Sequence, residues 1–182
     1  MRELIPPVSP EQLPEDLRAQ WEATPRPGLR SFIQVMAHAP DHFRRFNEVY
    51  GALRFDNHLD ARLTELVRLA VARTTECQVC MAGRHPDAVA AGLTEELVDQ
   101  LGGDARTGLT SAEDAAVAFA IAFATDHHTV DDELLDALAA HFTPTQIVEL
   151  ALLSVMCLVG RFSMLLGLVE DASCALPTST ER

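Results

Sequence analysis

The residues that most restrict the fold lie near the end of the chain, where the sequence from Ile147 to Val169 is almost uninterruptedly apolar. A stretch of this length can cross a bilayer, which takes about 20 residues. However, Glu149 and Arg161 interrupt it, and it lacks the basic flank that marks the cytoplasmic side of a membrane span. We therefore expect a central helix buried on all sides, by this subunit and by a partner, and no association with a membrane.

The composition favours helices and disfavours several classes of protein. Hydrophobic residues make up 48% of the chain and aromatic residues only 5%, so the core must consist mainly of Ala, Leu and Val, which is more typical of helices than of strands. The formal net charge is −13, and no run of Lys and Arg is present that would bind phosphates. We expect an all-α protein with no nucleic-acid partner.

Prolines separate the start of the chain from the rest. Pro6, Pro7, Pro10 and Pro14 prevent a regular helix at the start, and a short helix is expected only after them, before two further prolines. We expect three parts: a proline-rich arm with a short helix at 1–27, one all-helical domain at 28–170, and a C-terminal tail at 171–182. Arms of this kind often lie across a neighbouring subunit.

The cysteines and the first residues together indicate a cytoplasmic protein. Cys77, Cys80, Cys157 and Cys174 are too few and too unevenly placed to form the disulfide framework of a small secreted domain. The chain also starts without the apolar run of a signal peptide and reaches proline at once. We therefore expect the reducing cytoplasm as the location.

Cys77 and Cys80 form a Cys-x-x-Cys motif, which has a direct chemical meaning. Two cysteines at this spacing at the start of a helix can close a disulfide, and the helix N-terminus stabilises a thiolate. The motif alone leaves three interpretations open: a redox dithiol, half of a zinc site, or no role. Zinc needs two more ligands, and neither Cys157 nor Cys174 offers a second pair while His85 would be a lone third ligand, so zinc is disfavoured.

Two ionisable residues give the cysteine pair a chemical context. Glu65 lies on a helix expected over 60–75, and an antiparallel neighbour would bring its carboxylate toward the thiols, where burial would raise its pKa and let it pass protons. The alternative is a solvated residue or an ion-pair partner of Arg62 or Arg68. His85 is a candidate base for forming the thiolate. Its alternative role, just before a proline, is a helix cap or a surface residue.

A second group of polar residues, Asp126, His127 and His128, has the composition of a metal or acid–base site. Adjacent histidines point to different faces of a helix, and this group lies at an expected helix end. We therefore interpret it as a surface cap and expect no metal site there.

These features together resemble the carboxymuconolactone decarboxylase and alkylhydroperoxidase D superfamily. The resemblance rests on Glu65 twelve residues before Cys77, on Cys77-x-x-Cys80, on a nearby histidine, and on Ala90-Ala91-Gly92 followed by Leu93-Thr94. The helix at 63–72 and the stretch at 142–169 are similar as well. The resemblance thus covers about residues 40–169.

The resemblance implies a fold, an activity and partners. It implies an all-α, alkylhydroperoxidase D-like helical bundle that is an obligate homo-oligomer, a trimer or hexamer, of the peroxidase-related branch. It also implies that Cys80 attacks the peroxide, that Cys77 resolves the product as a disulfide, and that Glu65 relays protons. The partners would be a hydroperoxide substrate and a thiol or disulfide-reductase electron donor, with no cofactor and no metal.

One position departs from the pattern of the family. The family histidine falls four residues after the second cysteine, which here is Arg84, and His85 comes one residue late. One residue turns a side chain by about 100° around a helix. An irregular turn at Pro86 would bring His85 to the thiols as a base, and otherwise Arg84 would stabilise the thiolate of Cys80 by its charge.

The sequence therefore predicts a thiol-dependent alkyl hydroperoxidase, an antioxidant oxidoreductase with peroxiredoxin-type activity. The expected catalytic residues are Cys80, Cys77, Glu65 and His85. Two alternatives remain open at this point: a carboxymuconolactone decarboxylase-type enzyme, and a redox-sensing oligomer that forms the disulfide without turning over a substrate.

Overall fold

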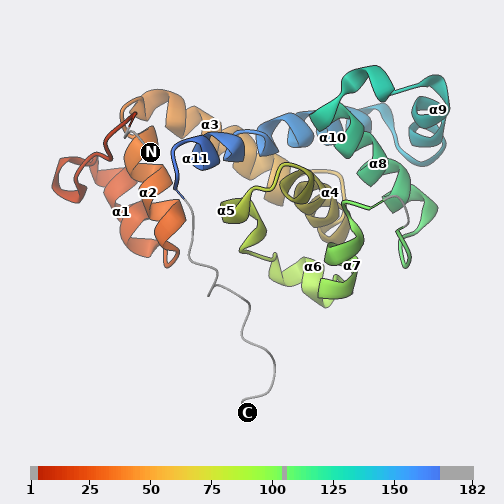
Figure 1. Cartoon of the computed structure of the whole chain (residues 1–182), viewed down its shortest axis with the longest axis horizontal. Helices are drawn as coiled ribbons and strands as arrows, with labels where there is room; N and C mark the ends of the chain where they lie inside the picture. The colour runs from red at the N-terminus through yellow and green to blue at the C-terminus, as the bar shows by residue number, and fades with distance from the viewer. Residues whose placement is uncertain (1–3, 104–105, 169–182) are drawn as a thin grey trace, which may run out of the picture.

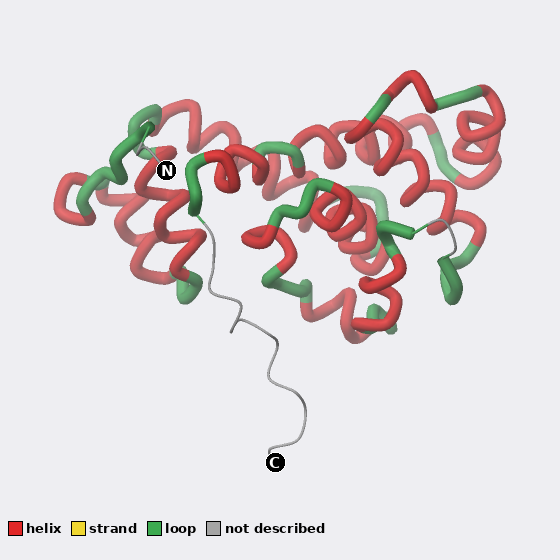
Figure 2. The backbone as a smooth tube through the Cα atoms, viewed as in Figure 1, coloured by secondary structure: helices red, strands yellow, loops and turns green. Residues whose placement is uncertain are grey.

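The computed structural model describes residues 4–103 and 106–168, and every regular element in these residues is a helix (Figures 1 and 2). The helices are η1 (Pro10–Gln12), α1 (Glu15–Ala23), α2 (Pro27–Met36), α3 (Pro40–Phe55), α4 (Ala61–Thr74), α5 (Gln78–Met81), α6 (Pro86–Ala90), α7 (Glu95–Gln100), α8 (Ser111–Thr125), η2 (His127–Thr129), α9 (Asp132–His141), α10 (Pro144–Cys157) and α11 (Gly160–Leu165). The expected all-helical fold is thus present. The expected tail at 171–182 lies outside the described residues.

α4 is the central helix of the fold. All its residues from Leu63 to Ala72 are buried, and it packs against α8 and α10 as well as against the short helices α5, α6 and α7 (Figure 1). Asp60 caps its N-terminus by accepting a hydrogen bond from the N–H of Leu63 at 2.8 Å, as the sequence predicts. The helix that carries Glu65 is therefore part of the core.

The N-terminal arm folds back on its own chain. Leu13 and Leu17 are buried in one apolar cluster with Ile33 of α2 and Phe43 of α3. Gln34 of α2 binds the arm as well, because its side-chain amide donates to the carbonyl of Val8 at 2.8 Å. The short helix expected after the prolines is therefore confirmed as α1, which contacts α2, and the arm before it contains one further short helix, η1, which contacts α1.

The C-terminal apolar stretch forms two helices, α10 and α11, which meet at a turn at residues 158–159. Pro144–Leu165 is long and apolar enough to cross a membrane by length and composition, and 28% of its most apolar window is buried in this chain. α10 buries the side that carries Leu150 and Leu153 and exposes Val148, Leu152 and Val155. The expected single helix is therefore wrong at residues 158–159, whereas burial on all sides requires a partner and stays a prediction, because this chain covers only one side of α10. Val169, the expected end of the stretch, lies outside the described residues.

Candidate active site

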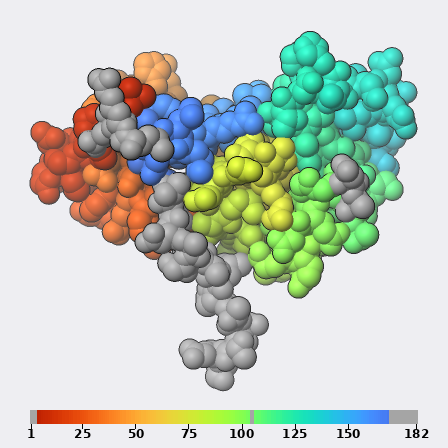
Figure 3. Space-filling model, viewed as in Figure 1, coloured from red at the N-terminus to blue at the C-terminus, as the bar shows by residue number. Residues whose placement is uncertain are grey.

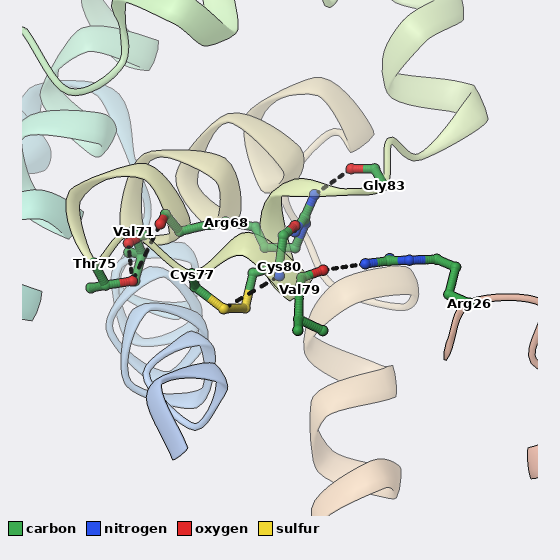
Figure 4. Close-up of a disulfide and its surroundings, with 9 residues drawn as sticks. Arg26, Arg68, Val71, Thr75, Cys77, Val79, Cys80 and Gly83 are labelled. Atoms are coloured by element: carbon green, nitrogen blue, oxygen red, sulfur yellow. Dashed lines mark hydrogen bonds between the residues drawn. A yellow bond between two sulfur atoms is a disulfide. The ribbon is translucent and has the colours of Figure 1, made fainter. Parts of the chain in front are cut away.

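The two cysteines of the motif form a disulfide at the start of α5 (Figure 4). Cys77 is the N-cap residue of α5, and its Sγ accepts a hydrogen bond from the N–H of Cys80 at 3.3 Å. The chain reaches Cys77 through Glu76, which has a left-handed φ of 52° and turns the backbone out of α4. Cys77 is buried, whereas Cys80 is half-buried, so the second cysteine is the more accessible of the two.

The helix that follows the cysteines is short. The sequence predicts one helix from the motif to Ala91, but α5 ends at Met81 and a separate helix, α6, begins at Pro86. Proline at the first helical position needs no hydrogen bond to its nitrogen, which fits it to start a new helix. Gly92 has a φ of 88° after α6, which confirms the left-handed C-terminal position expected for it.

Glu65 is paired with Arg68 beneath the motif. The carboxylate of Glu65 accepts two hydrogen bonds from the guanidinium of Arg68, at 2.8 and 2.7 Å, and a third from the backbone N–H of His85 at 3.0 Å. Arg68 also donates to the carbonyls of Cys80 and Gly83, at 2.6 and 2.9 Å (Figure 4). This buried ion pair thus fixes the backbone on both sides of the break between α5 and α6.

The ion pair determines the protonation state of Glu65. Burial raises the pKa of this carboxyl. The hydrogen bonds and charge of Arg68, the charge of Arg54 and the N–H of His85 lower it by more than burial raises it, so the net pKa is below 4.5. The expected raised pKa is therefore wrong. The ionised, hydrogen-bonded carboxylate matches the ion-pair alternative and holds the motif in place.

His85 and Arg84 both point to structural partners. His85 is the N-cap residue of α6, where its Nδ1 accepts from the N–H of Asp87 at 3.2 Å. Arg84 forms an ion pair with Glu95 of α7 at 2.9 Å and donates to the carbonyl of Met81 at 2.6 Å. Neither residue is among those that line the cavity beside Cys80. The turn at Pro86 is irregular, as the sequence allows, and the imidazole of His85 serves it as a cap.

A cavity of about 130 Å³ opens beside Cys80. α2, α3, the α5 segment and the turn between α10 and α11 contribute its walls, and Figure 3 shows α11 between the N-terminal helices and the α5 segment. Its polar lining includes Tyr50, Arg54 and Arg68. Cys157 lines it too, and burial raises the pKa of this thiol to about 11. Cys80 therefore faces a mostly apolar space, the setting in which an organic substrate would meet a thiolate.

Several residues of this site were missed at the level of sequence. From the sequence, Arg68 is expected only as an ion-pair partner of Glu65. Its place among apolar residues, three positions after Glu65 on the same helix, is a signal that could have indicated a buried pair. Arg26 is 53 residues from Val79, whose carbonyl accepts a hydrogen bond from its guanidinium (Figure 4), and no local pattern reveals that contact. Gly160 lies inside an apolar helical pattern, and a glycine there is a signal that another part of the chain, here the two cysteines, comes close to the backbone.

Asp126, His127 and His128 lie at the surface away from this cavity. Their ligand atoms are within 4.8 Å of one another, and all three residues are exposed. The carboxylate of Asp126 accepts from the N–H of His128 at 3.1 Å and so caps η2, in line with the surface interpretation.

Comparison with known proteins finds a family that resembles part of the chain. Residues 40–122, which run from the start of α3 into α8 and include the motif, match the sequence profile of the Carboxymuconolactone decarboxylase family. The match covers less than half of the chain, so this part of the sequence resembles that family, and the solved structures described next share the fold. No curated protein matches the sequence.

Solved structures share the fold at low sequence identity. An alkylhydroperoxidase AhpD core, an uncharacterized peroxidase-related protein from Ralstonia eutropha JMP134, is 22% identical with a TM-score of 0.72, and the match covers 93% of this chain and 92% of that one. The debrominase Bmp8, as its C82A variant with 2,3,4-tribromopyrrole, is 20% identical with a TM-score of 0.72, covering 96% and 95%. A peroxidase-related protein from Silicibacter sp. TM1040 is 15% identical with a TM-score of 0.69, covering 89% and 88%.

Proposed function

We propose that this protein is a thiol-dependent hydroperoxidase that uses Cys80 as the nucleophile and Cys77 as the resolving thiol. The observation that carries the proposal is the different exposure of two cysteines within disulfide reach. Cys80 lines the cavity, whereas Cys77 is buried behind it, and their Cα atoms are 5.2 Å apart. A nucleophile must meet its substrate, but a resolving thiol needs to reach only the other sulfur.

The proposed reaction balances without a metal or cofactor. The thiolate of Cys80 attacks one peroxide oxygen, the O–O bond breaks, and the alkoxide leaves and takes up a proton, which gives an alcohol and a sulfenic acid on Cys80. The thiolate of Cys77 then attacks this sulfur, the S–S bond forms, and the hydroxide leaves as water after protonation. An external dithiol reduces the disulfide and supplies the two electrons of the cycle.

The charges around the motif support formation of the thiolate. Cys80 lies in the only turn of α5, and the guanidinium groups of Arg68 and Arg54 line the same cavity. Positive groups near a thiol lower its pKa and raise the fraction of reactive thiolate. In this proposal Glu65 holds Arg68, and thereby the backbone at Cys80, in position.

The test is consumption of cumene hydroperoxide by the reduced protein with a recycling dithiol. We expect the wild type to turn over and Cys80→Ser to consume none. Without the dithiol, Cys77→Ser should consume one equivalent and stop at a sulfenic acid that dimedone traps. Unchanged turnover in Cys80→Ser contradicts the proposal. A single oxidation to the disulfide in the wild type, without further turnover, identifies a redox sensor instead of an enzyme.

A second reaction class rests on a specific structural likeness. The debrominase Bmp8 shares the fold over 95% of its length, and in the present chain Cys80 faces a mostly apolar cavity. Reductive debromination would replace bromine by hydrogen, release bromide and oxidise the two thiols to the disulfide. Bromide release from 2,3,4-tribromopyrrole by the reduced protein, compared with Cys80→Ser, tests this reaction beside the peroxide assay.

We also propose that the protein is a homo-oligomer whose contact includes α10. Val148, Leu152 and Val155 are between 47% and 57% exposed and lie at helical spacing on one face. Burial of these side chains by a second copy would remove apolar area from water. Leu152→Glu should lower the molar mass measured by light scattering, and an unchanged mass would place the contact elsewhere.

A further inference from the structure

A second cavity adjoins the one beside Cys80 and shares part of its apolar wall. The second cavity, of about 290 Å³, lies among α1, α2 and α3 and shares with the first the lining residues Leu29, Phe32, Phe46, Tyr50 and Arg54. For comparison, a dry protein cavity of about 150 Å³ holds benzene. The two adjoining spaces therefore suit a substrate with an aryl or alkyl body.

One positive group at this junction is incompletely satisfied. The Nε of Arg54 is buried and has no hydrogen-bond partner within the described part of the chain. Its Nη2 makes only a long contact with Glu65, at 3.4 Å. A buried donor without a partner is unfavourable, so an acceptor placed next to Arg54 by a ligand would be bound favourably.

The carboxylate of Glu65 does not account for this second arginine. Both oxygens of Glu65 already accept the shorter hydrogen bonds of Arg68. One buried carboxylate therefore faces two guanidinium groups, which leaves a local excess of positive charge in a chain with a net charge of −13. The described lining of both cavities contains no Asp or Glu that would neutralise it.

We propose that the preferred substrate is an organic hydroperoxide that carries a carboxylate, with its apolar body in the two adjoining cavities and its carboxylate on the guanidinium of Arg54. This inference rests on the proposed peroxidase function and names its substrate class. The planar guanidinium, with Nε and Nη donors on one side, matches the two oxygens of a carboxylate. The centre of the Phe55 ring lies 5.1 Å from the guanidinium carbon of Arg54, so this ring covers one face of the guanidinium and leaves its edge for the carboxylate.

The chemical step leaves the carboxylate unchanged. Cys80 takes one oxygen from the peroxide, the O–O bond breaks, and the product is the hydroxy acid, while Arg54 holds the carboxylate before and after the reaction. Arg54 is thus a specificity-determining residue. Its effect is expected in the ratio of kcat/KM between charged and neutral substrates.

The test compares cumene hydroperoxide with its para-carboxylate derivative. We expect the wild type to prefer the charged peroxide, and Arg54→Gln to lower the ratio of kcat/KM, charged over neutral, by about 10- to 100-fold, the value of a charge-assisted hydrogen bond. Arg45→Gln, on the exposed part of the same helix, is the matched control and should leave the ratio unchanged. An equal loss for both peroxides, with the ratio unchanged, would restrict Arg54 to its effect on the thiolate and overturn the inference.

A binding measurement separates failure of this inference from failure of the proposed function. Calorimetry of the oxidised protein with para-isopropylbenzoate requires no turnover, and we expect binding to the wild type, weaker binding to Arg54→Lys and none to Arg54→Gln. Arg54→Lys keeps the charge and covers the case in which Arg54→Gln does not fold. Equal affinity in the wild type and Arg54→Lys, or no binding to the wild type, overturns the inference. Binding without peroxide consumption would overturn only the reaction.

Discussion

Gly160 lies so close to Cys80 that no side chain fits between them. A Cβ placed on Gly160 would lie 2.2 Å from the Sγ of Cys80 and 2.7 Å from the Sγ of Cys77. A carbon atom that is not bonded to a sulfur atom does not come this close to it, so glycine is required where α11 begins. The start of α11 therefore forms the cover of the disulfide.

Gly160→Ala should destabilise the disulfide form more than the dithiol form. The two sulfur atoms are held together when oxidised and cannot move apart to admit a methyl group, whereas free thiols can rotate away. Overpacking of this kind costs about 1–3 kcal/mol. A titration with reduced and oxidised dithiothreitol should show the variant reduced at a lower dithiol concentration, and the melting temperature should fall more for the oxidised protein.

Gly51→Ala is the matched control for this experiment. Gly51 lies within α3, and a Cβ there meets no atom within 4 Å. The control should keep the thiol–disulfide equilibrium and gain up to about 1 kcal/mol from helix propensity. If Gly160→Ala changes the oxidised and reduced forms equally, the contact affects the helix and not the disulfide.

Local patterns in the sequence predict much of the fold. The periodic apolar residues predict the main helices, and the caps at Asp60, Thr143 and Gly92 are where local chemistry places them. The sequence from Ser111 to Asp114 predicts a capping box at the start of α8, and the structure forms it one residue earlier, with Thr110 and Glu113. Such features depend on neighbours within a few residues, which is why the sequence reveals them.

The site is harder to predict because its contacts are distant in sequence. The spacing of Glu65, Cys77 and Cys80 indicates the motif, but it does not show whether the surroundings of Glu65 raise or lower its pKa. That direction depends on Arg68 and Arg54, whose charges outweigh burial. Similarly, the contact of Gly160 with the disulfide joins elements that are 80 residues apart, and no local rule encodes it.

Glu65 should make the stability depend on pH in acid. Its folded-state pKa lies below 4.5, its value in an unfolded chain, so its stabilising contribution is complete above about pH 4.5 and is lost as the pH falls through the folded-state pKa. Glu65→Gln should lower the free energy of unfolding by about 3–5 kcal/mol at neutral pH, because Arg68 is left buried without a counter-ion. Urea unfolding between neutral pH and about pH 3 should show a shallower acid decline in the variant.

A surface control and a double variant show whether the loss of stability comes from the ion pair. Glu133→Gln, at an exposed position of α9, should change the free energy of unfolding by no more than about 0.5 kcal/mol. The double variant Glu65→Leu with Arg68→Met removes both charges and should lose less than the sum of the single variants. An acid decline as steep in Glu65→Gln as in the wild type would contradict the lowered pKa.

His85→Asn tests whether His85 is a cap or a base. Asparagine also caps helices, so this variant should keep the stability of the protein and the rate at which cumene hydroperoxide oxidises Cys80, whereas His85→Ala should lose about 1 kcal/mol of stability. A general base contributes about 10²–10⁴-fold to a rate. A loss of that size in His85→Asn, measured by stopped-flow peroxide consumption, would assign the base to His85 after all.

Cys157 should be an unreactive thiol although it lines the same cavity as Cys80. Burial raises its pKa from 9.0 to about 11, so its thiolate fraction near pH 8 is about a hundredfold lower than that of an ordinary thiol. Iodoacetamide should therefore label Cys157 slowly in the native reduced protein, about tenfold faster for each pH unit up to about pH 11, and at an ordinary rate in urea. Peptide mass mapping gives both rates.

The same property decides which thiol can resolve the sulfenic acid on Cys80. A protonated Cys157 is a poor nucleophile, so Cys77→Ser should accumulate the sulfenic acid and form no disulfide between Cys80 and Cys157. Non-reducing peptide mapping after one equivalent of peroxide shows the difference. A Cys80–Cys157 disulfide would mean that α10 moves toward α5 during the cycle, and then the resolving role would belong to both thiols.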